Sequence, residues 1–385
     1  MRVLLVTFSD LLPFALTKVL NPALGYCAIV VDEPDISKKM LENYPSLRDK
    51  IFPFYELKEC VENFHYDFIL SVLDFRSIFK MANDYQKKGV AFEKLVNVCL
   101  KDNGRENDFL LKRALHYYQE HLTEFKIFAT GLSYTRDGIL PNQFDKKLFN
   151  FGRGGQDLYY DYQIAKFILE VCKGGGYIRY ALIGLAPYSF NYDVSLSYVG
   201  SFRLPQYCMA FNDLHNFWMN INDYKKIFFQ EYLNFQMPFD SIAIEDASGG
   251  SSLRTIKYIN RDNRISAREK FDIWKNKNFP ETKKENIKIL DDYLTLCEKN
   301  NVRAIMFLPP FTAGYIKYFS RQKLDEFYYL IREAQKKHPS AFFFDGWKLQ
   351  GFSDMDFEDL DHLNLNGAAK FSAIFNNFIE SLEKG

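Results

Sequence analysis

The sequence predicts an α/β protein built on parallel sheets, and three observations support that class. Short apolar runs recur along the chain and are separated by segments of helix length, which is the pattern of βαβ units. One run ends in Gly-Leu-Ser. A strand that ends in this way places the serine at the carboxyl edge of the sheet, where open α/β folds bind their ligands. With 385 residues, 47% of them hydrophobic, the chain is long enough for two domains or for one large domain with insertions.

Residues 1–75 are predicted to form a small Rossmann-like α/β domain. Its strands are expected at Val3–Phe8, Cys27–Val31, Ile51–Phe54 and Phe68–Leu73. A nucleotide is the default ligand of such a layer, but no G-x-G-x-x-G follows the first strand. Asp32, at the end of the second strand, is equally explained as an ordinary turn residue. A recognition or scaffolding role is therefore favoured for this domain.

Residues 76–125 are predicted to form a helical connector. The segments FEKLVNVCL and FLLKRALHYYQEHL have apolar residues three and four apart, and a polar break at 102–108 separates them. His116 and His121 lie on the second segment, but their spacing of five does not suit a pair of metal ligands. Both histidines are interpreted as structural.

Residues 126–385 contain a second α/β series, which predicts a doubly wound parallel sheet. An insertion at about 188–300 interrupts it; this stretch is mostly helical and aromatic and contains the loop-like segment Ser248-Gly-Gly-Ser-Ser. Placed after the third strand, it would overhang the carboxyl edge of the sheet as a lid or an acceptor pocket, or serve structure alone. The strands are expected to end at Gly131, Phe151, Gly184, Leu308 and Phe344.

Composition excludes several classes of partner. The formal net charge is zero and no basic block dominates, which disfavours nucleic acid and anionic membranes. No run approaches 18 apolar residues, and the amino terminus carries Asp10 and Pro13 without a cleavage site, so a cytoplasmic protein with no membrane span is expected. No zinc site or disulfide framework is implied by the scattered cysteines Cys27, Cys60, Cys99, Cys172, Cys208 and Cys297.

Ser133 and His362 are the candidate catalytic pair. Ser133 follows an apolar run on a tight turn, where a serine is either a nucleophile or a helix N-cap. His362 is one of six histidines and has Asp359 three residues before it. In a helical turn this spacing lets the carboxylate hold one imidazole nitrogen while the other points away. Asp361, adjacent to His362, is expected to point elsewhere.

Three blocks of residues 126–382 resemble those of the SGNH/GDSL hydrolase superfamily, which implies a flavodoxin-like doubly wound fold. No cofactor is expected, and a metal hydrolase is disfavoured because no two histidines have ligand spacing. Gly131-Leu-Ser133 resembles the Gly-Asp-Ser block, Asn150 to Asp157 the second block, and Asp359-Leu-Asp-His362 the terminal block. The resemblance implies Ser133 as nucleophile, His362 as base and Asp359 as its orienter. It also implies that the backbone N–H groups of Ser133 and Gly155 form the oxyanion hole.

The chain departs from the superfamily at two positions. Leu132 replaces the usual aspartate, and Ala186 stands where the oxyanion-hole asparagine is expected. Losing one oxyanion donor typically costs about 10²–10³ in kcat, so slow hydrolysis of simple esters is expected. Asn191 could substitute only if its loop folds back towards the site.

The sequence leaves two functions open. The first is a serine esterase or O-acyl transferase acting on a glycan or glycoconjugate precursor, because the resemblance extends to proteins that modify bacterial surface polysaccharides. The second is a non-catalytic glycan-related binding or scaffold protein that keeps the fold. An α/β-hydrolase is disfavoured, since the chain has no G-x-S-x-G.

Overall fold

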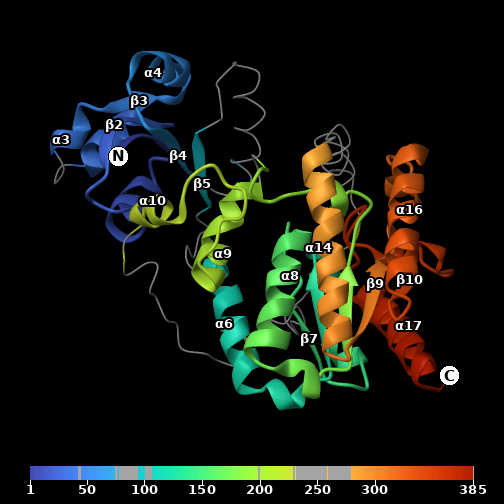
Figure 1. The fold of residues 1–385 in the computed structure, drawn as a ribbon. Helices are drawn as coiled ribbons and strands as arrows, with labels where there is room; N and C mark the ends of the chain where they lie inside the picture. Colours follow the sequence, from blue (N-terminus) through green and yellow to red (C-terminus); the bar gives the residue numbers. More distant parts are fainter. Residues whose placement is uncertain are drawn as a thin grey trace. The chain divides into compact units, whose positions relative to one another are not determined.

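The computed structural model divides the chain into two compact units, each with its own parallel sheet (Figure 1). Unit 1 contains Met1–Lys112 and Val194–Pro238, and unit 2 contains Arg113–Asp193 and Phe239–Gly385. Each unit is therefore assembled from two stretches of chain. The structure describes residues 1–41, 45–73, 77, 94–99, 106–197, 200–228, 230, 258 and 279–384.

The sheet of unit 1 has five parallel strands in the order β3-β2-β1-β4-β5. This is the strand order of the Rossmann type of doubly wound sheet. The inner strands are buried on both faces, which explains their unbroken apolar runs. The four predicted strands are confirmed to within two residues at each end. The strands are β1 (Arg2–Thr7), β2 (Gly25–Val31), β3 (Ile51–Pro53), β4 (Phe68–Leu73) and β5 (Leu95–Cys99).

The helical connector predicted for residues 76–125 is wrong at FEKLVNVCL, which contains β5. β5 pairs in parallel with Ile69–Leu73 of β4, and its apolar residues Leu95, Val96 and Val98 are buried. A short apolar run fits a buried strand as well as a helix, and here pairing with β4 decides the outcome. The second segment is helical as predicted, in α6 (Glu106–Glu120). Residues 78–93 and 101–105 lie outside the described residues.

The segment from Val194 onwards completes unit 1. Trp218 Nε1 donates to the carbonyl of Leu95 at 3.1 Å, and Asn97 Nδ2 donates to Ser201 Oγ at 3.3 Å. Phe228 forms an antiparallel bridge with Leu20. The helices of unit 1 are α1 (Leu12–Phe14), α2 (Pro34–Met40), α3 (Pro45–Arg48), α4 (Leu57–Asn63), α9 (Leu204–Phe211) and α10 (Ile221–Lys226).

The predicted insertion at about 188–300 is therefore not one body. Residues 194–238 join unit 1, whereas α14 (Pro280–Lys299) packs in unit 2. The described parts contain the helices α9, α10 and α14, in keeping with the mostly helical character expected. Ser248–Ser252 lies outside the described residues, and the lid or acceptor pocket expected of the insertion stays a prediction.

The sheet of unit 2 also has five parallel strands, in the order β10-β9-β8-β6-β7. Counted within the unit this is the order 2-1-3-4-5, which flavodoxin-like sheets have. The strand order reverses between β6 and β8, and ligands of open α/β sheets bind beyond the carboxyl ends of strands at such a point. The strands are β6 (Ile127–Gly131), β7 (Leu148–Asn150), β8 (Tyr180–Gly184), β9 (Arg303–Leu308) and β10 (Phe342–Asp345).

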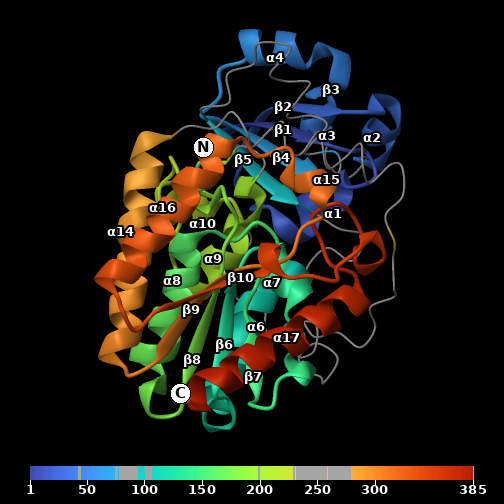
Figure 2. The same ribbon diagram turned by 90° about the vertical axis from the view of Figure 1, so that its right-hand side faces the viewer.

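Helices cover both faces of the unit 2 sheet. On one face, Phe371 and Phe375 of α17 (Leu365–Lys384) pack with Phe307 of β9. On the other, Thr130 Oγ1 of β6 lies 3.1 Å from the hydroxyl of Tyr293 on α14. Figure 2 shows α17 on one side of the sheet and α8 with α14 on the other. The remaining helices are α7 (Ser133–Gly138), α8 (Leu158–Lys166), α15 (Ala313–Ile316) and α16 (Arg321–Lys337).

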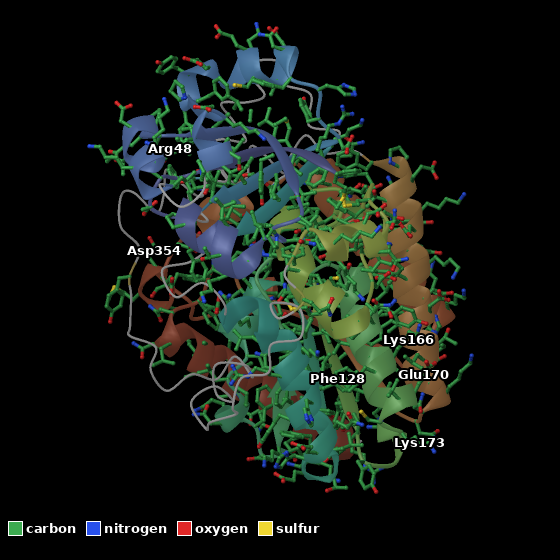
Figure 3. All side chains as sticks on the ribbon, turned by 90° about the vertical axis from the view of Figure 1, so that its left-hand side faces the viewer. Arg48, Phe128, Lys166, Glu170, Lys173 and Asp354 are labelled. Atoms are coloured by element: carbon green, nitrogen blue, oxygen red, sulfur yellow. The ribbon has the colours of Figure 1, made fainter. Side chains whose placement is uncertain are left out.

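The side chains of unit 2 divide between interior and surface as this layering requires. Phe128 on β6 is fully buried, whereas Glu170 and Lys173, beyond the end of α8, are exposed (Figure 3). Within the described ranges, no helix has the length and apolar content needed to cross a bilayer.

Candidate active site

The turn that carries Ser133 depends on a close approach between β6, β8 and α7. Gly131 ends β6 with φ of +139°, and a Cβ built there would lie 2.3 Å from Thr135 Oγ1 and 2.7 Å from the carbonyl oxygen of Gly184. Only glycine fits this space and this backbone conformation. Ser133 is the first residue of α7 and its side chain is half-buried. The hydroxyl is thus fixed at the carboxyl end of β6, beside the point where the strand order reverses.

His362 lies on a closed turn between β10 and α17. An antiparallel bridge joins Phe357 to Leu363, and the N–H of Glu358 donates to the carbonyl of His362 at 3.0 Å. Asp359 Oδ1 accepts the backbone N–H groups of Asp361 at 3.0 Å and of His362 at 2.7 Å. A carboxylate that accepts N–H groups two and three residues ahead stabilises such a turn. The turn, and not the helix expected from the sequence, brings Asp359 to His362.

The turn is anchored by Asn364 and Gly367 at the start of α17. Asn364 Oδ1 accepts the N–H of Gly367 at 3.0 Å, and its Nδ2 donates to the carbonyl of Met355 at 2.8 Å. A Cβ on Gly367 would lie 2.0 Å from the carbonyl oxygen of Asp356. The Leu-Asn-Leu-Asn-Gly segment therefore caps α17 and holds the His362 turn against it.

The structure brings together the three predicted catalytic side chains. Ser133 Oγ lies 2.8 Å from His362 Nε2, and His362 Nδ1 lies 3.0 and 3.1 Å from the two carboxylate oxygens of Asp359. If Nδ1 carries its proton towards Asp359, Nε2 has a lone pair for the Ser133 hydroxyl. That chain of contacts can abstract a proton from the serine.

The electrostatics of the site favour charge on both partners. Burial alone would raise the pKa of Asp359, but the charge and hydrogen bonds of His362 hold it well below its usual range. Burial alone would lower the pKa of His362, but Asp359 and Asp361 outweigh it and raise this pKa well above its usual value. Asp359 therefore stays ionised, and His362 binds a proton tightly.

The expectation that Asp361 points away from His362 is wrong. Its Oδ1 lies 3.3 Å from His362 Nδ1, and its Oδ2 accepts the Tyr134 hydroxyl at 2.8 Å. The hydroxyl of Tyr188 in turn donates to that of Tyr134 at 2.9 Å. Adjacent side chains diverge in a helix, but the tight turn closed by Asp359 places both carboxylates beside the imidazole. Tyr134 and Tyr188 were not singled out in the sequence, because a tyrosine carries no spacing signal for such a contact.

The three groups Asp359, Asp361 and His362 offer ligand atoms within 4.8 Å of one another. Both imidazole nitrogens already have protein partners, Ser133 on one side and Asp359 on the other. A metal would need one of those nitrogens as a free lone pair. We therefore assign no metal to this cluster.

Gly155 lies on a loop held against the serine turn. The N–H of Arg153 donates to the carbonyl of Gly131 at 3.0 Å, and Asn150 Nδ2 donates to carbonyls of α7 and the residue after it, those of Thr135 and Ile139, both at 2.9 Å. Gly155 has a left-handed φ of +66°, and its carbonyl accepts the Tyr192 hydroxyl at 2.8 Å. The loop resembling the second block thus lies beside Ser133.

The two backbone N–H groups expected to form the oxyanion hole are unpaired in the described part of the chain. Among the residues described, neither the N–H of Ser133 nor that of Gly155 has a hydrogen-bond partner. Ala186 supplies no third donor, because it is buried and its N–H donates to Ser189 Oγ at 2.9 Å. Across the described ranges, no hydrogen bond connects the side chain of Asn191 with Ser133 or Gly155.

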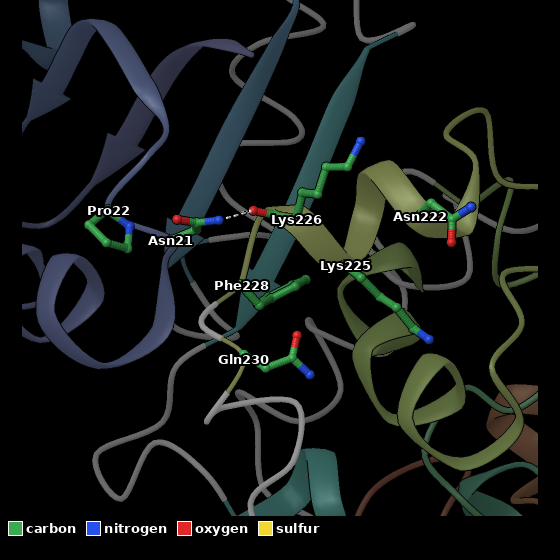
Figure 4. Close-up of a pocket in the computed structure, with 7 residues that line it drawn as sticks. All are labelled: Asn21, Pro22, Asn222, Lys225, Lys226, Phe228 and Gln230. Carbon is green, nitrogen blue, oxygen red and sulfur yellow. Dashed lines mark hydrogen bonds between the residues drawn. The ribbon is translucent and has the colours of Figure 1, made fainter.

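In unit 1, Asp32 has a structural partner. Its Oδ1 accepts both the N–H and the hydroxyl of Ser9 at 2.8 Å, so it closes the turns after β1 and β2. Unit 1 also has an open pocket of about 630 Å³ (Figure 4). The Lys226 ammonium at this pocket pairs with Asp223 at 2.8 Å. The pocket is lined by Asn21, Pro22, Asn222, Lys225, Lys226, Phe228 and Gln230.

Comparisons with known proteins give the chain no family. No protein-family model and no curated protein matches it. Among solved structures, one of Thermotoga maritima Cel5A in complex with mannotriose is similar at 11% identity with a TM-score of 0.22, covering 82% of this chain and 89% of that one. A likeness of this strength carries no argument about fold or function.

Proposed function

We propose that unit 2 is an SGNH-type serine esterase or O-acyl transferase that acts on a glycan or glycoconjugate precursor. The observation that carries the proposal is the continuous contact from Ser133 Oγ through the His362 ring to Asp359. The half-buried serine lies at the strand-order reversal of a flavodoxin-like sheet, where such folds bind ligands. The sequence resemblance alone supports a glycan as the substrate class.

The residues define the steps. Ser133 Oγ attacks the ester carbonyl carbon while its proton moves to His362 Nε2, and the N–H groups of Ser133 and Gly155 hold the resulting oxyanion. When the tetrahedral intermediate collapses, the carbon–oxygen bond to the leaving alcohol breaks and His362 returns the proton to that alcohol. Water or an acceptor hydroxyl then attacks the acyl-serine and gives its proton to His362 Nε2; the bond between the acyl carbon and Ser133 Oγ breaks, and His362 returns the proton to Ser133. Water gives hydrolysis, and a sugar hydroxyl gives transfer.

A specific observation favours the second candidate, a binding protein that keeps the fold. Among the described residues, two backbone donors are identifiable for the oxyanion, because Ala186 replaces the asparagine and its N–H is already bonded. Losing one preorganised donor typically costs about 10²–10³ in rate. An enzyme with this site is therefore expected to turn over small esters slowly, and the dependence of that turnover on Ser133 decides between the two candidates.

The test measures release of p-nitrophenol from p-nitrophenyl acetate with and without an oligosaccharide acceptor, together with mass spectrometry of the sugar. Wild type is expected to release p-nitrophenol above background, and Ser133→Ala to reduce this by about 10³-fold or more. Ser381→Ala is the matched control, since Ser381 is an exposed serine on α17. Acetylated sugar indicates a transferase, and free acetate alone indicates an esterase. Equal rates in wild type and Ser133→Ala, with the oligosaccharide bound by both, would leave the binding protein as the better account.

A further inference from the structure

We propose that Asp361 is a second positioning carboxylate for His362, held in place by the hydroxyls of Tyr134 and Tyr188. The inference rests on the proposed function and deepens it. Neither the proposed triad nor the sequence resemblance assigns a role to Asp361, Tyr134 or Tyr188. It is carried by the burial of Asp361 and by the contacts of its two carboxylate oxygens.

Asp361 is a buried carboxylate whose basic partner is the imidazole. The residue is 4% exposed, and a buried charge needs a compensating partner. Its Oδ1 accepts no hydrogen bond from any residue that the structure describes, and it lies 3.3 Å from His362 Nδ1. Within the part of the chain that the structure describes, no lysine or arginine forms an ion pair with it. The charge of Asp361 is therefore directed at His362.

Asp359 and Asp361 interact differently with His362 Nδ1. Nδ1 carries a single proton, and Asp359 takes it because its oxygens lie at 3.0 and 3.1 Å in a turn that fixes them. Asp361, at 3.3 Å, accepts no share of that hydrogen bond and acts through its charge. Asp359 thus sets the orientation and tautomer of the ring. Asp361 stabilises the imidazolium that forms when the Ser133 proton reaches Nε2.

The tyrosine hydroxyls hold the Asp361 carboxylate in position. Burial raises the pKa of Tyr134 well above its usual value, and the charge of Asp361 adds to the effect, so Tyr134 stays a hydrogen-bond donor. Its hydroxyl donates to Oδ2 of Asp361 and leaves Oδ1 facing the imidazole. Tyr188 donates to the Tyr134 oxygen at 2.9 Å, and successive hydrogen bonds of this kind strengthen one another.

The other titratable and polar groups that face Asp361 and His362 come from four parts of the fold. Ser133 and Tyr134 approach from α7, Tyr188 from the segment after β8, Tyr315 from α15, and Asp359 from the turn itself. Asp359 is the second anion in the group. Removing the charge of Asp361 should therefore weaken proton binding at His362 without changing the contact between Ser133 and the ring.

Asp361→Asn tests this role because asparagine keeps an oxygen for the Tyr134 hydroxyl and removes the charge. The pKa of His362 is measured by NMR of histidine-labelled full-length protein, with His362→Gln to assign the signal. We expect that pKa to fall by about one pH unit in Asp361→Asn. The acid limb of kcat/KM for an activated ester should move to lower pH by the same amount, and the alkaline plateau should fall several-fold because the base is weaker.

Asp354→Asn is the matched control, since it removes the same charge from an exposed position before the turn; it should leave the His362 titration unchanged. If Asp361→Asn fails to fold, Asp361→Ser removes the same charge and gives the same readout. An unchanged His362 titration in the folded variant would overturn the role of Asp361, whatever the turnover. A shifted titration in a protein without turnover would support Asp361 and reject the proposed function, so the two failures are distinguishable.

Discussion

At the scale of single residues, Asp359 holds both the imidazole and the backbone of its turn. Asp359→Asn preserves an oxygen at the Oδ1 position, which can still accept the two backbone N–H groups and the proton of His362 Nδ1. It puts an amide N–H donor in place of Oδ2, which lies 3.1 Å from Nδ1, and it removes the negative charge. Both changes weaken the preference for a proton on Nδ1 and so favour the tautomer that carries the proton on Nε2. That tautomer has no lone pair for the serine hydroxyl.

We expect Asp359→Asn to lower kcat/KM for an activated ester by about 10³–10⁴-fold while the melting temperature changes little. Steady-state kinetics and a calorimetric melt measure the two quantities, and Asp354→Asn serves as the charge control. The loss should exceed that of Asp361→Asn at every pH, because only Asp359 sets the tautomer. A larger loss in Asp361→Asn would transfer the orienting role to Asp361.

The candidate catalytic residues could be predicted because each is marked by a short pattern in the sequence. Ser133 follows a strand, and Asp359 and His362 have a fixed spacing, so both halves could be located without knowing the sheet. Helical geometry predicts that Asp361 points away from His362. The segment is instead a turn, closed by the bridge between Phe357 and Leu363, and the prediction fails for that reason. The contact of Tyr134 with Asp361 spans 227 positions, and no local pattern reports a contact of that range.

At the scale of elements, the position of α7 depends on its close approach to β8. A Cβ on Gly184 would lie 1.8 Å from Thr135 Oγ1 and 3.0 Å from the ring of Phe307. Thr135 Oγ1 has no hydrogen-bond partner in the described part of the chain, so we expect its volume to matter more than its polarity. The position of Ser133 therefore depends on a glycine two strands away in the sequence.

We expect Gly184→Ala to lower the free energy of unfolding by about 1–3 kcal/mol, because overpacking forces α7 away from β8. Esterase activity should fall with it, since Ser133 begins α7. Adding Thr135→Ala removes the nearest clashing atom and should restore part of both losses. Gly176→Ala is the control, because a Cβ there meets no atom within 4 Å. Urea titration measures the stabilities, and equal stability of Gly184→Ala and wild type would refute this packing account.

The strands of both sheets could be predicted because buried parallel strands are continuous apolar runs. The segment at 95–99 could not, since its five residues fit a helix face equally well and only pairing with β4 makes it a strand. The assignment of Val194–Pro238 to unit 1 likewise follows from contacts with Leu20, Leu95 and Asn97. Those partners are about a hundred or more positions away.

At the scale of the whole molecule, each unit is built from two stretches, so the predicted boundary at residue 126 is not a place to cut the chain. A fragment of residues 106–385 keeps 194–238 but removes the sheet on which that segment packs. Trp218 would lose its ring contact with Phe68 and its hydrogen bond to Leu95, and Phe228 would lose its bridge to Leu20.

We expect fragment 106–385 to bind a hydrophobic dye and to elute as an aggregate, because exposed apolar surface of this kind drives association. The same fragment with residues 194–238 replaced by a short Gly-Ser linker should give a cooperative melt and bind less dye. Size-exclusion chromatography and dye fluorescence compare the matched pair. Equal behaviour of the two fragments would contradict the division of the chain into these units.

The central claim is that His362 activates Ser133 as a nucleophile, and covalent labelling by a fluorophosphonate tests it most directly. The account predicts one phosphonate adduct per chain, located at Ser133 by peptide mass spectrometry, whose rate of formation falls as pH drops and His362 becomes protonated. The adduct should be absent in Ser133→Ala and strongly slowed in His362→Gln. Labelling that is absent from folded wild type, or that proceeds equally well in His362→Gln, would contradict the account.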